Sequence, residues 1–162
     1  MDEKKQTDPA PGEAPKSILL VEDDFFVRDI YQRKLREIGF EVHTAGDGLE
    51  GMERLKEKKP DLVLLDIFMP YMDGRDMLRE IKSNPEWKDI PVMLLTNFSA
   101  SEGVHDGFDL GADEYLIKSH FTPSEVTKKI YDMFEARKKN GIISEEGKGA
   151  KPQAEGAEEN KQ

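Results

Sequence analysis

Five short apolar runs, each followed by a segment with helical spacing, constrain the fold of this chain more than any other feature. The runs are Ile18–Val21, Phe40–Ala45, Leu62–Leu65, Val92–Leu95 and Tyr115–Ile117. The central runs are continuously apolar, as expected for parallel strands that helices cover on both faces. Five strand–helix units are too few to close an eight-stranded barrel. The pattern therefore predicts an α/β fold with a doubly wound, five-stranded parallel sheet in a three-layer sandwich.

The helices are predicted from periodicity and from start signals. After the first run, Val27, Ile30, Tyr31 and Leu35 recur at the spacing of one helical face. The stretches Ser99–Glu102 and Thr122–Glu125 match capping boxes, which predict helix starts after the fourth and fifth runs.

The two ends of the chain differ in composition from the middle. Residues 1–16 contain no large apolar residue after Met1, and residues 139–162 contain only Ile142 and Ile143. Such segments bury too little apolar surface to offset the entropy of ordering the chain. We expect a disordered extension over residues 1–16, one domain over residues 17–138 and a disordered tail over residues 139–162.

Charge and composition exclude several classes of function. The net charge is −10, which disfavours general binding to nucleic acid because phosphate contacts need clustered Lys and Arg. Without cysteine, the chain has no disulfide, thiolate zinc site or cysteine nucleophile. No apolar run approaches the roughly 18 residues that a membrane helix needs. We expect a soluble cytoplasmic protein that binds neither nucleic acid nor membranes.

Polar side chains follow four of the predicted strands. Glu22-Asp23-Asp24 follow the first run, Asp66 the third, Thr96 the fourth and Lys118 the fifth. The carboxyl ends of parallel strands share one edge of the sheet, so these groups are expected around a common cleft. Closely packed carboxylates must protonate or share a cation, and oxygen ligands suit Mg²⁺. An Asp nucleophile beside Mg²⁺, Lys118 and the Thr96 hydroxyl favours phosphoryl transfer to a carboxylate.

Taken singly, each of these positions also has an ordinary structural interpretation. Acids at strand ends are common as helix N-caps, and this interpretation suits Asp24 best. The joint pattern at four strand ends is more specific than any one of its members.

The pieces ILLVEDD, DLVLLDIFMPYMDG, VMLLTN and GADEYLIK resemble the receiver domain of two-component response regulators. The resemblance covers residues 17–138 and implies a flavodoxin-like (βα)5 fold of the stand-alone, single-domain type. It implies that a histidine kinase or a histidine phosphotransfer protein phosphorylates Asp66. It also implies a signalling domain that is not an enzyme beyond its own phosphorylation and dephosphorylation, and that acts on a downstream protein.

The same resemblance implies a role for each site residue. Glu22 and Asp23 form the acidic pair that holds Mg²⁺, and Asp66 and the carbonyl of Phe68 complete the protein ligands. Thr96 is the switch hydroxyl, Tyr115 the switch aromatic, and Lys118 contacts the phosphoryl group. Two positions depart from the family pattern: Ser119 replaces the usual proline after the lysine, and Asn97 replaces a usually small residue.

Two alternatives on related topologies are weaker. A phosphatase of the haloacid dehalogenase type needs an acidic residue two positions after its nucleophile, and this position is Phe68. A flavin-binding domain needs a Ser/Thr/Gly-rich phosphate loop after the first strand, which the sequence lacks.

Overall fold

The computed structural model describes residues 14–97 and 111–144 of the chain. Within these ranges, the strands are β1 (Ser17–Val21), β2 (Glu41–Ala45), β3 (Leu62–Leu65), β4 (Val92–Thr96) and β5 (Glu114–Ile117). The helices are α1 (Phe25–Glu37), α2 (Gly48–Glu57), α3 (Gly74–Ser83) and α5 (Pro123–Ser144), with the short 3₁₀ helix η1 (Lys118–His120). The helix expected to start at Ser99 lies outside the described residues.

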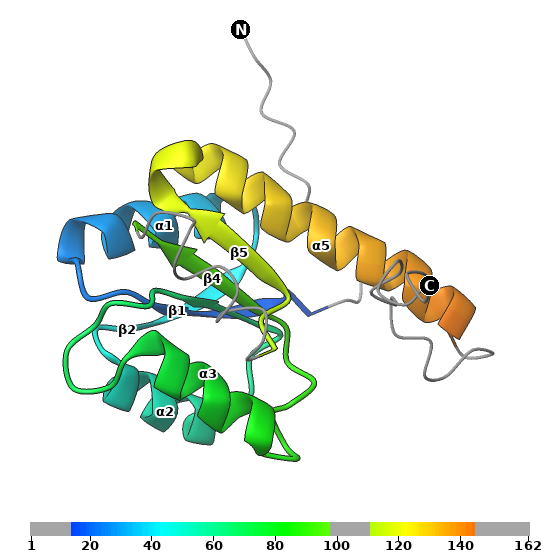
Figure 1. Ribbon diagram of the computed structural model, residues 1–162. Helices are drawn as coiled ribbons and strands as arrows, with labels where there is room; N and C mark the ends of the chain where they lie inside the picture. The colour runs from blue at the N-terminus through cyan, green and yellow to red at the C-terminus, as the bar shows by residue number, and fades with distance from the viewer. Residues whose placement is uncertain (1–13, 98–110, 145–162) are drawn as a thin grey trace, which may run out of the picture. The chain divides into compact units, whose positions relative to one another are not determined.

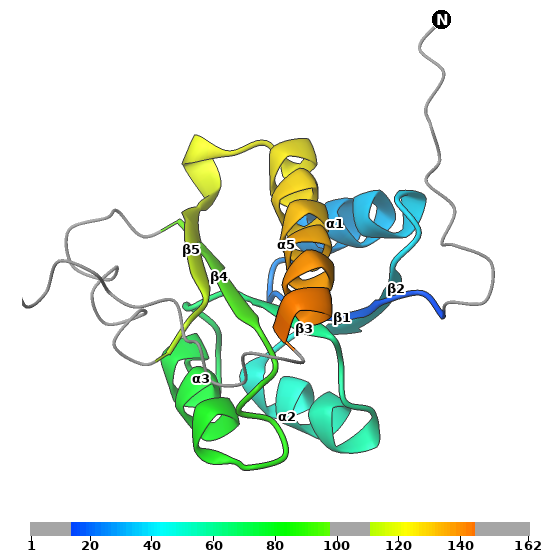
Figure 2. The ribbon, with the colours of Figure 1, turned by 90° about the vertical axis from the view of Figure 1, so that its right-hand side faces the viewer.

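The strands form one parallel sheet in the order β2-β1-β3-β4-β5, which confirms the predicted doubly wound fold. In the unit that ends at Thr127, α1 lies on one face of the sheet, and α2 and α3 lie on the other (Figures 1 and 2). Strand order reverses between β1 and β3, which pair through Val21 and Leu65. Ligand sites of open α/β sheets lie beyond the strand ends at such a point.

Alternate strand residues explain the continuous apolar runs. Leu19, Val21, Val63 and Leu65 join one buried cluster with side chains of α2 and α3. Their strand neighbours are buried too, since the sheet is covered on both faces. The edge strand β2 is only partly buried, in keeping with its mixed sequence EVHTA.

The second compact unit begins at Lys128, and its described part is the remainder of α5. This helix continues to Ser144, so residues 139–144, which we assigned to the disordered tail, are helical. The run Glu135–Lys139 consists of strong helix formers, and these carry the helix past its last apolar stripe. The domain boundaries themselves stay predictions.

Candidate functional site

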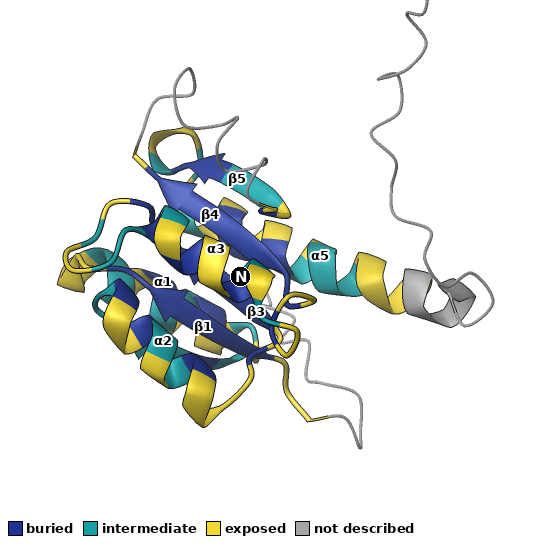
Figure 3. Cartoon of the chain, turned by 60° about the horizontal axis from the view of Figure 1, so that its bottom comes forward, coloured by how far each residue is buried: buried dark blue, intermediate teal, exposed yellow. Residues whose placement is uncertain are grey.

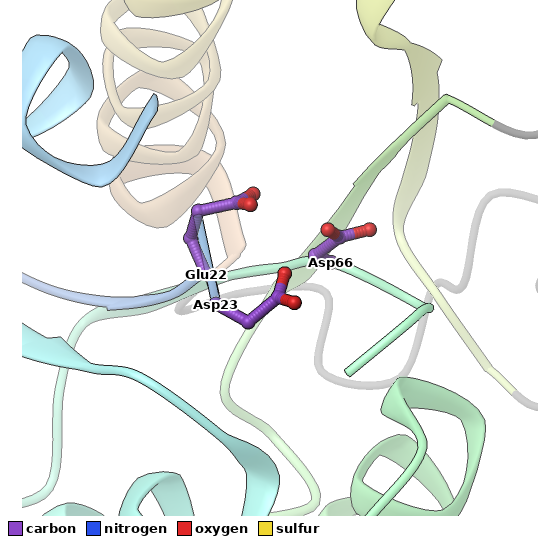
Figure 4. A group of neighbouring side chains, drawn as sticks. All are labelled: Glu22, Asp23 and Asp66. Carbon is purple, nitrogen blue, oxygen red and sulfur yellow. The ribbon is translucent and has the colours of Figure 1, made fainter. Parts of the chain in front are cut away.

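Three carboxylates meet at the strand edge where β1 and β3 end. Glu22 and Asp23 follow β1 and Asp66 follows β3, and one carboxylate oxygen from each lies within 4.8 Å of the others (Figure 4). The sheet holds two of them in place, because the backbone N–H of Glu22 donates to Ala45 and that of Asp66 donates to Val21, both at 3.0 Å. The predicted clustering of these acids is therefore present.

Two of the three carboxylates are buried. Glu22 is 2% exposed and Asp66 is 7% exposed, whereas Asp23 is exposed. Burial raises the pKa of Glu22 to about 7, against the lowering effect of its hydrogen bond with Lys118. Burial also raises the pKa of Asp66, although the charge of Lys118 and the backbone N–H of Phe68 partly oppose it. Both groups are thus held where the charged form is costly.

Lys118, the first residue after β5, bridges these two acids. Its Nζ donates to Glu22 Oε2 at 2.6 Å and to Asp66 Oδ2 at 3.0 Å. Burial works to lower the pKa of Lys118, but the hydrogen bond with Glu22 and the charge of Asp66 outweigh it, and the pKa is raised. Lys118 is therefore a fixed, charged donor facing Asp66.

Thr96 and Tyr115 occupy the neighbouring strands. Thr96 ends β4 and is fully buried, one residue further along the strand than the level of Asp66, since Leu94 pairs with Leu65. Tyr115 of β5 pairs with Leu94 of β4, and its ring packs against the buried cluster. Thr96 thus ends the strand next to β3, which Asp66 follows, and Tyr115 lies one strand further away.

Asp24 and Phe68 lie in different surroundings, since Asp24 caps a helix and Phe68 is exposed. Asp24 caps α1, accepting hydrogen bonds from the N–H groups of Phe26 at 2.9 Å and Val27 at 3.1 Å. This confirms its interpretation as an N-cap, and Asp24 is not part of the three-carboxylate cluster. Phe68, two residues after Asp66, exposes 47% of its surface.

Lys118 begins a 3₁₀ turn, Lys118–His120, where the family pattern has a proline. The backbone N–H of Phe121 closes the turn by donating to the carbonyl of Lys118. Ser119 thus occupies a helical turn that keeps Lys118 at the end of β5.

Two contributors to the site were missed by the sequence analysis. Arg28 of α1 donates through Nη1 to the backbone carbonyl of Glu22 at 2.7 Å, and its guanidinium lies 5.7 Å from the centre of the Phe25 ring. Gly74 begins α3 directly against Asp66: a Cβ at this position would lie 2.1 Å from the Asp66 carbonyl oxygen. The Asp73-Gly74 pair at the start of α3 was a sequence signal for the role of Gly74, whereas no sequence pattern marks Arg28.

The carboxylates fit a small divalent cation. Oxygen ligands lie about 2.1 Å from Mg²⁺, so ligands on opposite sides of the ion are about 4.2 Å apart. The observed spread of up to 4.8 Å needs only small side-chain adjustments. Oxygen donors without sulfur or imidazole also match the preference of Mg²⁺.

Comparisons with known proteins agree with this geometry. Residues 18–131 match the family model described as "Response regulator receiver domain". The chain is 36% identical over 129 residues to "Probable transcriptional regulator ycf27" of Cyanophora paradoxa, an alignment covering 80% of this chain and 52% of the relative. The chain therefore spans about half the length of the curated relatives it matches.

Two solved structures are similar in fold and in sequence. The phosphorylated cyanobacterial phytochrome response regulator RcpA is 34% identical with a TM-score of 0.66, covering 75% of this chain and 93% of that one. The Mn²⁺-bound form of response regulator Rcp1 is also 34% identical, with a TM-score of 0.62 and coverage of 80% and 93%. Across the described ranges, 14–97 and 111–144, none of the helices has the length and apolar character needed to cross a membrane.

Proposed function

Because this chain belongs to the response regulator receiver domain family, we propose that it is a switch operated by phosphorylation of Asp66. The observation that carries the proposal is the position of Lys118, which bridges Asp66 and Glu22 beside Asp23. RcpA, named as a phosphorylated response regulator, supports it by similarity.

In the proposed reaction, a carboxylate oxygen of Asp66 attacks the phosphorus of a phosphohistidine. The P–N bond breaks, the imidazole nitrogen keeps the electron pair, and Asp66 becomes an acyl phosphate. Lys118 then donates to a phosphoryl oxygen in place of Asp66 Oδ2, while its bond to Glu22 keeps the ammonium group oriented. Positioning and charge stabilisation of this kind supply most of the catalysis in phosphoryl transfer.

The carboxylates of Glu22, Asp23 and Asp66, with the carbonyl of Phe68, would hold Mg²⁺. Bound there, Mg²⁺ supplies charge neutralisation for the phosphoryl oxygens. Rcp1, named as a Mn²⁺-bound form, supports a divalent cation by similarity.

The conformational response is proposed to run through Thr96, with Tyr115 as the second switch residue. Hydrogen bonds to charged groups are worth about 1.5–3 kcal/mol each. Lys118 exchanges its bond to Asp66 for one to the phosphoryl group, so the bond from Thr96 is the new one and supplies about 1.5–3 kcal/mol. Inverting a 1:99 equilibrium takes about 5.5 kcal/mol, so this bond shifts the conformational population without inverting it.

The phosphodonor is proposed to be a histidine kinase or a histidine phosphotransfer protein. Phe25 and Phe26 follow the acidic residues at the start of α1, and their exposed rings offer such a protein an apolar contact beside the site. The downstream target is expected to be a protein, and the absence of binding to nucleic acid and membranes stays a prediction.

The proposal is tested by phosphorylation with Mg²⁺ and a small phosphoramidate donor, followed by mass spectrometry. The wild type is expected to gain one phosphoryl group and Asp66→Asn none. Asp24→Asn is the matched control, because Asn is as good an N-cap as Asp and this residue lies outside the cluster. Phosphorylation that persists in Asp66→Asn would contradict the assignment.

The alternative phosphatase function is not favoured. Phe68 occupies the position of the required second acid, and a phenyl ring cannot transfer a proton. The family match points to a signalling domain instead.

A further inference from the structure

Helices α2 and α3 lie on one face of the sheet and carry exposed residues (Figure 3). A wide groove is lined by residues of these helices and of the loops before and after α3. Its volume is about 810 Å³. The lining residues are Asp47, Leu49, Glu50, Met52, Glu53, Lys56, Tyr71, Met72, Glu80, Asn84 and Trp87. None of them belongs to the site of the proposed phosphorylation, so the groove calls for a separate function.

The groove is apolar and adaptable inside. Leu49 exposes 51% of its surface and Tyr71 exposes 84%, and both line the same groove. Trp87 is nearly buried, and Met52 and Met72 complete the apolar lining. Methionine is flexible and polarisable, and it is common at surfaces that accept varied apolar partners.

Tyr71 is held at the groove by a costly backbone conformation. Its φ is 69°, and in the described ranges it is the only residue other than glycine with a positive φ. This region is unfavourable for a bulky side chain, and such outliers cluster at binding sites, where the surrounding structure enforces them. An Asn or Gly would fit this turn with less strain, yet this chain carries an aromatic ring there.

The charge around the groove is predominantly acidic. Asp47, Glu50, Glu53 and Glu80 face one lysine, Lys56. The pairing among these groups is weak: Glu53 and Lys56 are 3.4 Å apart and both well exposed. Glu80 makes no ion pair with any residue that the structure describes. The rim therefore attracts cationic side chains.

A neighbouring hollow is lined by more lysines than the groove. A second hollow of about 530 Å³ shares Lys56 and Trp87 with the first. Its lining includes three lysines, Lys56, Lys58 and Lys59, against Glu57 and Glu86.

We propose that this groove docks an amphipathic segment of a partner protein, with apolar side chains against Leu49, Tyr71 and Trp87 and with Lys or Arg over Glu53 and Glu80. A helix that lays an apolar face into such a groove is a common mode of peptide recognition. The residues after 144 cannot supply this segment, because they carry five Glu and three Lys.

The test selects ligands from a random-peptide phage library on the full-length wild-type chain. Peptides that bind the groove should combine aromatic or aliphatic residues with Lys or Arg. Leu49→Asp and Tyr71→Asn should each weaken a selected peptide at least about tenfold, as for an interface anchor. Asn tolerates the left-handed conformation at position 71, so this variant removes the ring and not the turn.

Charge reversal and a distant control complete the design. Glu53→Lys and Glu80→Lys should weaken the same peptide, and added salt should weaken it in the wild type. Ile30→Asp replaces an apolar residue of α1 that is 45% exposed and lies outside the groove, so it should bind the peptide as the wild type does. Asp66→Asn should bind it too, which separates this proposal from the proposed phosphorylation.

Three results would overturn the proposal. The first is that no selected peptide depends on Leu49 or Tyr71 in variants whose urea denaturation shows a folded protein. The second is that the peptides that do depend on them are acidic. The third is a wild-type dimer in sedimentation that Leu49→Asp dissociates, which would assign the groove to a second copy of the chain.

Discussion

Glu22→Gln is expected to stabilise the metal-free protein, and to do so increasingly as the pH rises. Glu22 is 2% exposed, and its carboxylate shares Lys118 with Asp66. Two buried acids and one buried base leave an excess negative charge inside the fold. The substitution removes one of these charges while keeping the shape of the side chain and an oxygen that can accept from Lys118.

The magnitude and the sign follow from the pKa of Glu22. Burial raises it from 4.5 to about 7. At about 1.4 kcal/mol per pKa unit, ionised Glu22 costs the folded state on the order of 3 kcal/mol. Below pH 4.5 the carboxyl is protonated in both states and costs nothing. Between pH 4.5 and 7 the unfolded chain loses the proton first, so the free energy of unfolding of the wild type falls as the pH rises.

The assay is urea denaturation of both proteins at pH 5, 6, 7 and 8 with a chelator present. The stability of Glu22→Gln minus that of the wild type should grow by about 1–3 kcal/mol from pH 5 to pH 8. Glu80→Gln is the matched control: its carboxylate is exposed on α3, and its curve should run parallel to that of the wild type.

The test depends on how the stability difference between Glu22→Gln and the wild type changes with pH. If the difference between Glu22→Gln and the wild type is the same at pH 5 and pH 8, then Lys118 fully compensates the charge of Glu22 and the reasoning is wrong. A difference that shrinks with rising pH would show that the ionised form is favoured in the fold, contrary to the effect of burial.

Three further outcomes are expected around the same site. Asp23→Asn should raise the melting temperature in chelator, because the charge of Asp23 acts unfavourably on Asp66. The same variant should abolish Mg²⁺ binding in calorimetry, and an unchanged affinity for Mg²⁺ would remove Asp23 from the ligands. Phe26→Ala should slow phosphorylation by a phosphohistidine protein, because Phe26 is 77% exposed and free to contact such a donor, and it should leave the rate with a small phosphoramidate unchanged. If the variant matches the wild type with both donors, Phe26 does not contact the donor protein. Phe68→Asn should shorten the lifetime of the aspartyl phosphate, since an amide can orient the attacking water and a phenyl ring cannot. Decay at the wild-type rate would show that Phe68 has no effect on hydrolysis.

The sheet could be predicted because its strands are short, continuously apolar and separated by helical segments. Boundaries differed by about one residue: β2 begins at Glu41 and β4 includes Thr96. The expected end of the folded part at residue 138 was wrong, because α5 continues to Ser144 beyond the strong helix formers Glu135–Lys139. The gathering of Glu22, Asp23, Asp66, Thr96 and Lys118 followed from a simple property of parallel sheets, whose carboxyl ends share one edge.

The environments of individual site residues could not be predicted. Glu22 and Asp23 are adjacent in sequence and chemically alike, yet one is buried and the other exposed. Glu22 still pairs with β2 through its N–H, so it continues the sheet, and Asp23 is the first residue to leave it. This distinction depends on where strand pairing stops, and a run of acids gives no signal for it.

The charge balance of the site links phosphorylation to a cation. Glu22, Asp66 and Lys118 already carry one excess negative charge when ionised, and a phosphoryl group on Asp66 raises it by about one more. Lys118 cannot neutralise this excess, because its single positive charge is already counted and is shared between Glu22 and Asp66. In the proposed phosphorylated state we therefore expect either a divalent cation or a proton on Glu22, whose raised pKa makes the second route available near neutral pH. Phosphorylation in chelator should consequently be more efficient at pH 6 than at pH 8, while with Mg²⁺ this preference should disappear; the same preference in both conditions would show that Glu22 plays no part in it.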